Sequence, residues 1–113
     1  MNNKAKYLYD ILDIVVDCCA TEIDSNGRMS VTKEDVLGKS RAENVSLTRE
    51  IFAIQVVNAG YSVTTVAQLL KRTPQSVRHL IAQGYSHEQT SNAFRLAKAE
   101  ATIKCRDIPS TGI

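Results

Sequence analysis

Apolar side chains recur at three- and four-residue steps between residues 4 and 23, which is the period of a helix with one buried face. The members of this stripe are Leu8, Ile11, Leu12, Val15, Cys18, Cys19 and Ile23. The run Asp24-Ser25-Asn26-Gly27 is typical of a tight turn, because Asn and Gly tolerate positive φ. The pattern predicts a first helix over residues 4–23 and a loop after it.

A short helix is predicted next. Thr32 and Asp35 have the spacing of a helix cap, and the helix is expected to run through Leu37 and end at Gly38. Residues 39–44 are polar and are expected to form a loop.

The third predicted helix is apolar around most of its circumference, so we expect it to be the central helix of the core. Ser46 is its expected N-terminal cap, and Asn58-Ala59-Gly60 is its expected end. Its apolar members are Ile51, Phe52, Ile54, Val56 and Val57.

Two further helices are predicted from their caps. Ser62 can cap a helix over residues 63–70, and Thr73 can cap the next one, where Pro74 takes the first position. Gly84 is expected to close that helix.

The last predicted helix begins at a capping box of Ser86 and Gln89 and reaches about residue 106. Its buried stripe is expected to be Phe94, Ala97, Ala101 and Cys105. The whole pattern predicts an all-α fold, a compact bundle of about six helices, in one domain over residues 1–108, with a flexible tail over 109–113.

Composition fits this picture. A chain of 113 residues with 43% hydrophobic and 23% charged residues has room for one globular core. No apolar run approaches the roughly 18 residues of a membrane span, and no secretory signal is visible, so we expect a cytoplasmic protein. The three cysteines form no CxxC pair and have no ligand spacing to His79 or His87, so we expect buried thiols and no metal site.

Charge is unevenly distributed along the chain. Residues 37–85 carry six basic and two acidic side chains, whereas residues 1–36 carry four basic and seven acidic ones. An anionic partner is therefore expected to bind the middle segment.

Residues 62–83 have the pattern of a helix-turn-helix. Ala67 lies where the two helices of this motif cross most closely, and apolar residues occupy the positions that join them, namely Val66, Leu70, Val77 and Leu80. In the turn, Lys71 and Arg72 replace the more usual glycine and apolar residue.

The outward face of the second helix carries Gln75, Arg78, His79 and Ala82. Gln and Arg can form paired hydrogen bonds with adenine and guanine edges in a major groove. We therefore predict base readout by Gln75, Arg78 and His79. Phosphate contacts are expected from Lys71, Arg72, Thr73 and Ser76, close to the helix N-terminus.

Residues 29–89 also resemble the C-terminal DNA-binding domain of DnaA, the bacterial chromosomal replication initiator. The similar stretches are Val31-Thr32-Lys33-Glu34-Asp35-Val36-Leu37-Gly38-Lys39-Ser40-Arg41, Val45 with Thr48-Arg49-Glu50-Ile51, Tyr61-Ser62-Val63, and Val66-Ala67-Gln68-Leu69-Leu70. The family's recognition signature Gly-Arg-Asp-His-Thr-Thr-Val is replaced by Arg72-Thr73-Pro74-Gln75-Ser76-Val77.

The resemblance implies a six-helix fold of the Trp-repressor type and further site residues. It implies that Arg41 reads bases from the minor groove and that Arg49 contacts the DNA backbone. Lys39 and Ser62 complete the expected phosphate contacts. No Gly-Lys-Ser/Thr phosphate loop occurs in the chain, so we expect neither nucleotide binding nor ATPase activity.

The sequence thus favours a sequence-specific, nucleoid-associated protein that binds double-stranded DNA as a transcription regulator or replication accessory. It is expected to need no cofactor and to catalyse no reaction, and a homodimer through the first or last helix is left open. The alternative is a helical protein–protein interaction module that has lost DNA binding.

Overall fold

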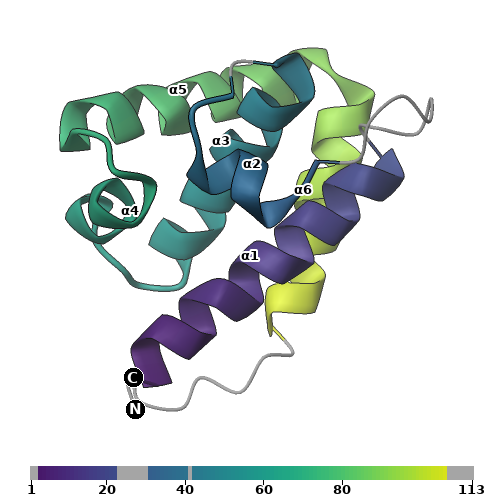
Figure 1. Cartoon of the computed structure of the whole chain (residues 1–113). Helices are drawn as coiled ribbons and strands as arrows, with labels where there is room; N and C mark the ends of the chain where they lie inside the picture. Colours follow the sequence, from purple (N-terminus) through teal and green to yellow (C-terminus); the bar gives the residue numbers. More distant parts are fainter. Residues whose placement is uncertain (1–2, 23–30, 41, 107–113) are drawn as a thin grey trace.

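The computed structural model describes residues 3–22, 31–40 and 42–106, and these residues form an all-α bundle with no strand among them (Figure 1). Its helices are α1 (Asn3–Glu22), α2 (Lys33–Leu37), α3 (Glu43–Asn58), α4 (Val63–Leu70), α5 (Pro74–Thr90) and α6 (Asn92–Arg106). The compact bundle of about six helices predicted from the sequence is confirmed. No helix in these ranges is long and apolar enough to cross a membrane.

Helix α3 lies at the centre of the bundle and contacts each of the other five helices. Every residue from Thr48 to Val56 is buried, so the helix has no solvent-facing side along this stretch. The prediction of a central core helix is confirmed. Full burial also encloses four polar or charged side chains, Thr48, Arg49, Glu50 and Gln55, and each of them needs a hydrogen-bond partner inside the protein.

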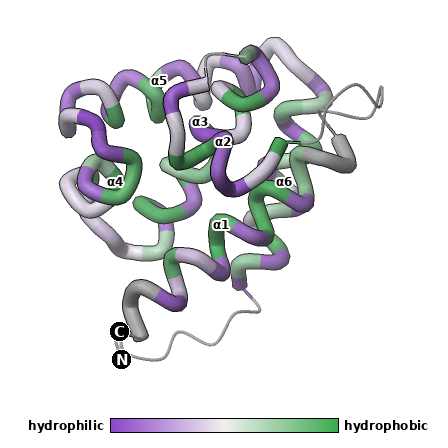
Figure 2. Tube along the Cα trace, in the orientation of Figure 1, coloured by the Kyte–Doolittle hydropathy of each residue, from purple (hydrophilic) through white to green (hydrophobic). Residues whose placement is uncertain are grey.

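Helices α1 and α6 pack against each other and against α3. Hydrophobic and hydrophilic segments alternate along α1, as expected for an amphipathic helix (Figure 2). Cys18 and Cys19 are buried in its inner face, and burial raises the pKa of both thiols to about 12. Across the contact, α6 buries Phe94, Ala97 and Ala101, as predicted, while Cys105 is half-buried. Residues 23–27 and the predicted tail over 109–113 lie outside the described ranges.

The predicted cap of α2 is confirmed. The Asp35 amide donates to Thr32 Oγ1 at 3.1 Å, and the Thr32 amide donates to Asp35 Oδ2 at 3.0 Å. This reciprocal pair satisfies two N–H groups that would have no partner within the helix. The helix ends at Leu37, before Gly38, as the sequence indicated.

The predicted start of α3 at Ser46 is wrong. The helix begins at Glu43, and the Ser46 amide already donates to the Ala42 carbonyl at 2.9 Å. Ala42, the residue before the helix, has no side chain that could cap it, while Glu43 places a negative charge in the first turn, where the helix dipole favours it. The loop predicted over residues 39–44 is therefore shorter than expected.

The predicted boundary between the last two helices is also wrong. Helix α5 continues through Gly84 to Thr90, so Ser86 and Gln89 lie inside it and form no capping box. The cap of α6 is Ser91, whose Oγ accepts the Phe94 amide at 3.2 Å. Gly84 serves close packing: a Cβ there would lie 2.6 Å from Ile54 Cδ1 and 3.4 Å from Glu50 Cβ, both on α3.

We expect Gly84→Leu to destabilise the fold, because the added side chain must displace Ile54 and part of Phe94. Overpacking of this kind costs about 1–3 kcal/mol of unfolding free energy. Urea denaturation measures this loss of unfolding free energy. Ala82→Leu, at an exposed position of the same helix, is the matched control. The control should change stability by no more than about 0.5 kcal/mol. Equal stabilities of the two variants would contradict the close approach.

Candidate nucleic-acid interface

Helices α4 and α5 are joined by a turn of three residues, 71–73, and both helices begin with the caps predicted from the sequence. Ser62 Oγ accepts the Thr65 amide at 3.2 Å, and Thr73 Oγ1 accepts the Ser76 amide at 3.1 Å. Pro74 takes the first position of α5, where its missing N–H removes no helical hydrogen bond. These local interactions fix where α5 begins.

The turn reverses direction at Lys71, which has φ 56° and ψ 47°, the left-handed conformation that usually favours glycine. The next amide, of Arg72, donates back to the Ala67 carbonyl at 2.9 Å. A lysine with an exposed side chain therefore occupies the tightest point of the chain between the two helices.

The inner faces of α4 and α5 pack against each other and against α3. Val66, Ala67, Leu70 and Val77 are all buried, and Leu80 and Ile81 are half-buried. These are the side chains predicted to join the two helices, and the structure places them together.

The outer face of α5 carries the predicted base-reading side chains. Gln75, Arg78 and His79 are all exposed, as is Ala82 on the same face. Ser76 lies at the edge of this face and is half-buried. Since Val77 is fully buried, one side of the helix is packed in the core and the opposite side is exposed to solvent.

The basic residues of two separate segments come together beside α5. Arg72 Nη2 donates to the Gly38 carbonyl at 3.3 Å, which links the 71–73 turn to the segment after α2. Lys39 and Lys71 are exposed in these two segments. Ser62 and Thr73 are also exposed, although each hydroxyl oxygen accepts a capping hydrogen bond.

Arg49 is not placed where the resemblance implied. It is only 3% exposed, and its guanidinium donates to the carbonyls of Asp35, Val36, Gly38 and Ser40 at 2.9–3.3 Å. These carbonyls belong to the end of α2 and the residues after it, where no further helical turn supplies donors, and the Asp35 carbonyl also accepts the Gly38 amide at 3.2 Å. Arg49 is thus a structural residue in this conformation, and a phosphate contact from it is not supported. Arg41 lies outside the described residues.

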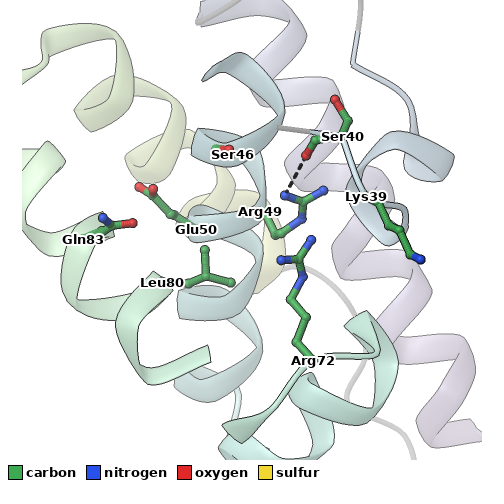
Figure 3. Close-up of a pocket in the computed structure, with 8 residues that line it drawn as sticks. All are labelled: Lys39, Ser40, Ser46, Arg49, Glu50, Arg72, Leu80 and Gln83. Atoms are coloured by element: carbon green, nitrogen blue, oxygen red, sulfur yellow. Dashed lines mark hydrogen bonds between the residues drawn. The ribbon is translucent and has the colours of Figure 1, made fainter. Parts of the chain in front are cut away.

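A cavity of about 280 Å³ lies beside this arginine, and the sequence analysis missed it (Figure 3). Its lining comes from the segment after α2, from α3, from the 71–73 turn and from α5: Lys39, Ser40, Ser46, Arg49, Glu50, Arg72, Leu80 and Gln83. The signal in the sequence was the charged pair Arg49-Glu50 in the middle of a helix predicted to be buried.

Glu50, in the lining of this cavity, forms another polar contact of the core. Its Oε1 lies 2.6 Å from His87 Nδ1, while the Glu50 side chain is 3% exposed. Burial raises the pKa of the Glu50 carboxyl, and the hydrogen bond and charge of His87, together with the charge of His79, oppose that rise. In the lining, burial lowers the pKa of Arg49, and the positive charge of Arg72 adds to the effect.

This arrangement supplies hydrogen-bond donors and positive charge at the surface. Among residues 3–22, 31–40 and 42–106, no three His, Cys, Asp or Glu side chains come together as metal ligands. Exposed donors and positive charge of this kind are able to bind anionic groups.

We expect Lys71→Gly to raise the free energy of unfolding by up to about 1 kcal/mol, because glycine adopts positive φ without the steric cost that lysine bears. Lys71→Ala is the matched control, since it removes the same charge and keeps the steric cost of positive φ. Chemical denaturation compares the two variants, and a glycine variant no more stable than the alanine variant would contradict the strained turn.

The raised pKa of Glu50 predicts a pH-dependent effect of Glu50→Gln. The folded state binds a proton at Glu50 more tightly than the unfolded state, so wild-type stability falls as pH rises from the ordinary carboxyl pKa of about 4.3 through the raised folded value. Glutamine carries no such charge and can still hydrogen-bond to His87. The stability of the variant relative to wild type should therefore increase with pH.

Urea denaturation between pH 4 and pH 8 measures this difference. Glu43→Gln, in the exposed first turn of the same helix, controls for the loss of one negative charge. If the stability difference between Glu50→Gln and wild type stays constant or decreases with pH, burial does not raise the pKa of Glu50.

No protein-family model, curated protein or solved structure matches this chain with significant similarity.

Proposed function

We propose that this chain binds double-stranded DNA, with the first half of α5 in the major groove. The observation that carries the proposal is the division of α5 into two faces: Val77 is buried, while Gln75, Arg78 and His79 are exposed. A helix that enters a groove needs a packed inner side for orientation and a polar outer side for contact.

Base readout is assigned to the exposed face of α5. Arg78 can donate two hydrogen bonds to a guanine edge, and Gln75 can pair with an adenine edge. His79 lies on the same exposed side and adds a donor or an acceptor according to its tautomer.

Backbone contacts are assigned to the residues around this face. Lys71 and Lys39 are exposed on segments that Arg72 holds together through the Gly38 carbonyl. The hydroxyls of Ser62, Thr73 and Ser76 lie at the N-termini of α4 and α5, where the helix dipole also favours a phosphate. Arg49 is left out of this set because its guanidinium is occupied by carbonyl oxygens.

The resemblance to the DNA-binding domain of DnaA supports the same class of function and further suggests a role in replication or transcription. It does not extend to the recognition signature, where Pro74, Gln75 and Ser76 replace the family's residues. We therefore propose a target sequence different from that of DnaA.

Fluorescence anisotropy with a mixed-sequence duplex tests the proposal. With about four phosphate contacts, log affinity should fall against log salt with a slope of about −4. A target selected from random duplexes then separates two roles: Arg78→Gln should lose about 1–3 kcal/mol of discrimination at one base position, and Lys71→Gln should weaken all duplexes and reduce the slope by about 1.

Lys104→Gln is the charge-matched control, because it lies on α6, a helix that does not contact α4. It should leave both affinity and slope unchanged. Absence of duplex binding at low salt, or an equal effect of all three variants, would refute the proposal.

A second candidate function is an interaction module, and one observation favours it. Leu96 and Ile103 on α6 are 53% and 61% exposed, and their seven-residue spacing puts them on one face of the helix. This candidate would account for a chain that binds no duplex at low salt.

A further inference from the structure

The cavity beside α3 contains two guanidinium groups that form no ion pair with a carboxylate of residues 3–22, 31–40 or 42–106. Arg49 and Arg72 lie side by side at its centre, and none of the ion pairs in the described part of the chain includes either residue (Figure 3). Their partners are neutral carbonyl oxygens. Two neighbouring cations repel each other, so a negative charge placed beside both would be stabilised.

Arg72 differs from Arg49 in that its hydrogen bonds are incomplete. Arg49 uses Nε, Nη1 and Nη2, each on a carbonyl. Arg72 uses Nη2 alone, on the Gly38 carbonyl at 3.3 Å, and its buried Nε has no acceptor. A buried donor without an acceptor costs about 1–3 kcal/mol. An oxyanion brought within hydrogen-bonding distance of this group would supply that acceptor.

The only carboxylate in the lining does not compete for these donors. Glu50 points its carboxylate away from the two guanidiniums, toward Gln83, and hydrogen-bonds to His87 (Figure 3). Lys39, Ser40 and Ser46 also belong to the lining, although the Lys39 side chain extends away from the two guanidiniums (Figure 3). The lining therefore combines two neighbouring guanidiniums with one carboxylate that is already paired.

The size of the cavity limits the ligand. A volume of about 280 Å³ holds several waters, each of which occupies roughly 30 Å³ of liquid, but falls below the roughly 300–1,000 Å³ of sites for drug-sized ligands. A single tetrahedral oxyanion fits this space and matches the fork of an arginine, which prefers phosphate and carboxylate oxygens.

We propose that this cavity binds one phosphate group, with Arg72 as its principal donor, Arg49 as the residue that fixes the position of residues 38–40, and Ser46 about one helical turn before Arg49 on α3. Two sources share this chemistry: a phosphodiester of the DNA backbone and the phosphoryl group of a small molecule. Only the first source rests on the proposed function.

The test is an NMR titration of the full chain with inorganic phosphate, against sodium chloride at matched ionic strength. The Arg72 Nε–H and the Ser46 amide should shift saturably with phosphate. Arg72→Lys keeps the charge and removes the Nε–H donor, and should weaken phosphate binding by about tenfold or more. Arg95→Lys, at an exposed position of α6, is the matched control and should leave phosphate binding unchanged.

A duplex titration then distinguishes the sources. If the backbone supplies the phosphate, duplex displaces inorganic phosphate and Arg72→Lys weakens all duplexes alike. If a small molecule supplies it, inorganic phosphate binds while duplex leaves the Arg72 signal and the affinity of Arg72→Lys for duplex unchanged. Either result supports the cavity as a phosphate site.

Three results separate failure of this inference from failure of the proposed function. The cavity proposal is overturned if neither phosphate nor duplex shifts the Arg72 Nε–H, even where duplex still binds through α5. It is also overturned if Arg72→Lys and Arg95→Lys weaken phosphate binding equally, which indicates diffuse surface attraction. Saturable phosphate binding without any duplex binding supports the cavity and refutes the DNA-binding proposal alone.

Discussion

The burial of α3 is the constraint on which the rest of the structure depends. Five helices pack around one, so every side chain from Thr48 to Val56 must find its partners inside the protein. Apolar members do so by contact with their neighbours. The polar members require directed hydrogen bonds: Arg49 binds the carbonyls after α2, Glu50 binds His87 on α5, and Gln55 donates to Thr102 on α6 at 2.8 Å. These bonds attach three surrounding elements to the central helix at defined positions.

The same interactions shape the candidate interface. Arg49 holds the segment that carries Lys39, and Arg72 reaches the same Gly38 carbonyl from the 71–73 turn. Glu50 and the missing side chain of Gly84 bring α5 close to α3. The exposed face of α5 is therefore positioned by polar and backbone contacts from behind, while its own side chains remain available. The side chains that pack α5 and those proposed to contact DNA thus fall on opposite sides of the same helix.

The sequence predicted those parts of the fold that depend on local interactions. The caps at Thr32, Ser62 and Thr73 and the buried stripe of α6 depend on short-range spacing, and the structure has them as expected. The predicted end of the helix at Gly84 was wrong. Glycine can either end a helix or allow a close approach of another element, and the sequence pattern around Gly84 does not distinguish the two cases, because the neighbour is on another helix. The burial of Arg49 and the cavity could not be predicted from the sequence, because the residues that form them are far apart in the chain. Arg72 and Gly38, for example, are separated by 34 residues.

The contact at Gly84 holds the middle of α5 close to α3. At about 1.5 Å of rise per residue, Gln75 lies roughly 13 Å along the axis from Gly84, so a tilt of about five degrees at the crossing would carry Gln75 sideways by about 1 Å. That displacement is enough to take a hydrogen-bonding side chain out of register with its target. The packing of a buried residue with no side chain thereby influences the position of exposed residues more than two helical turns away.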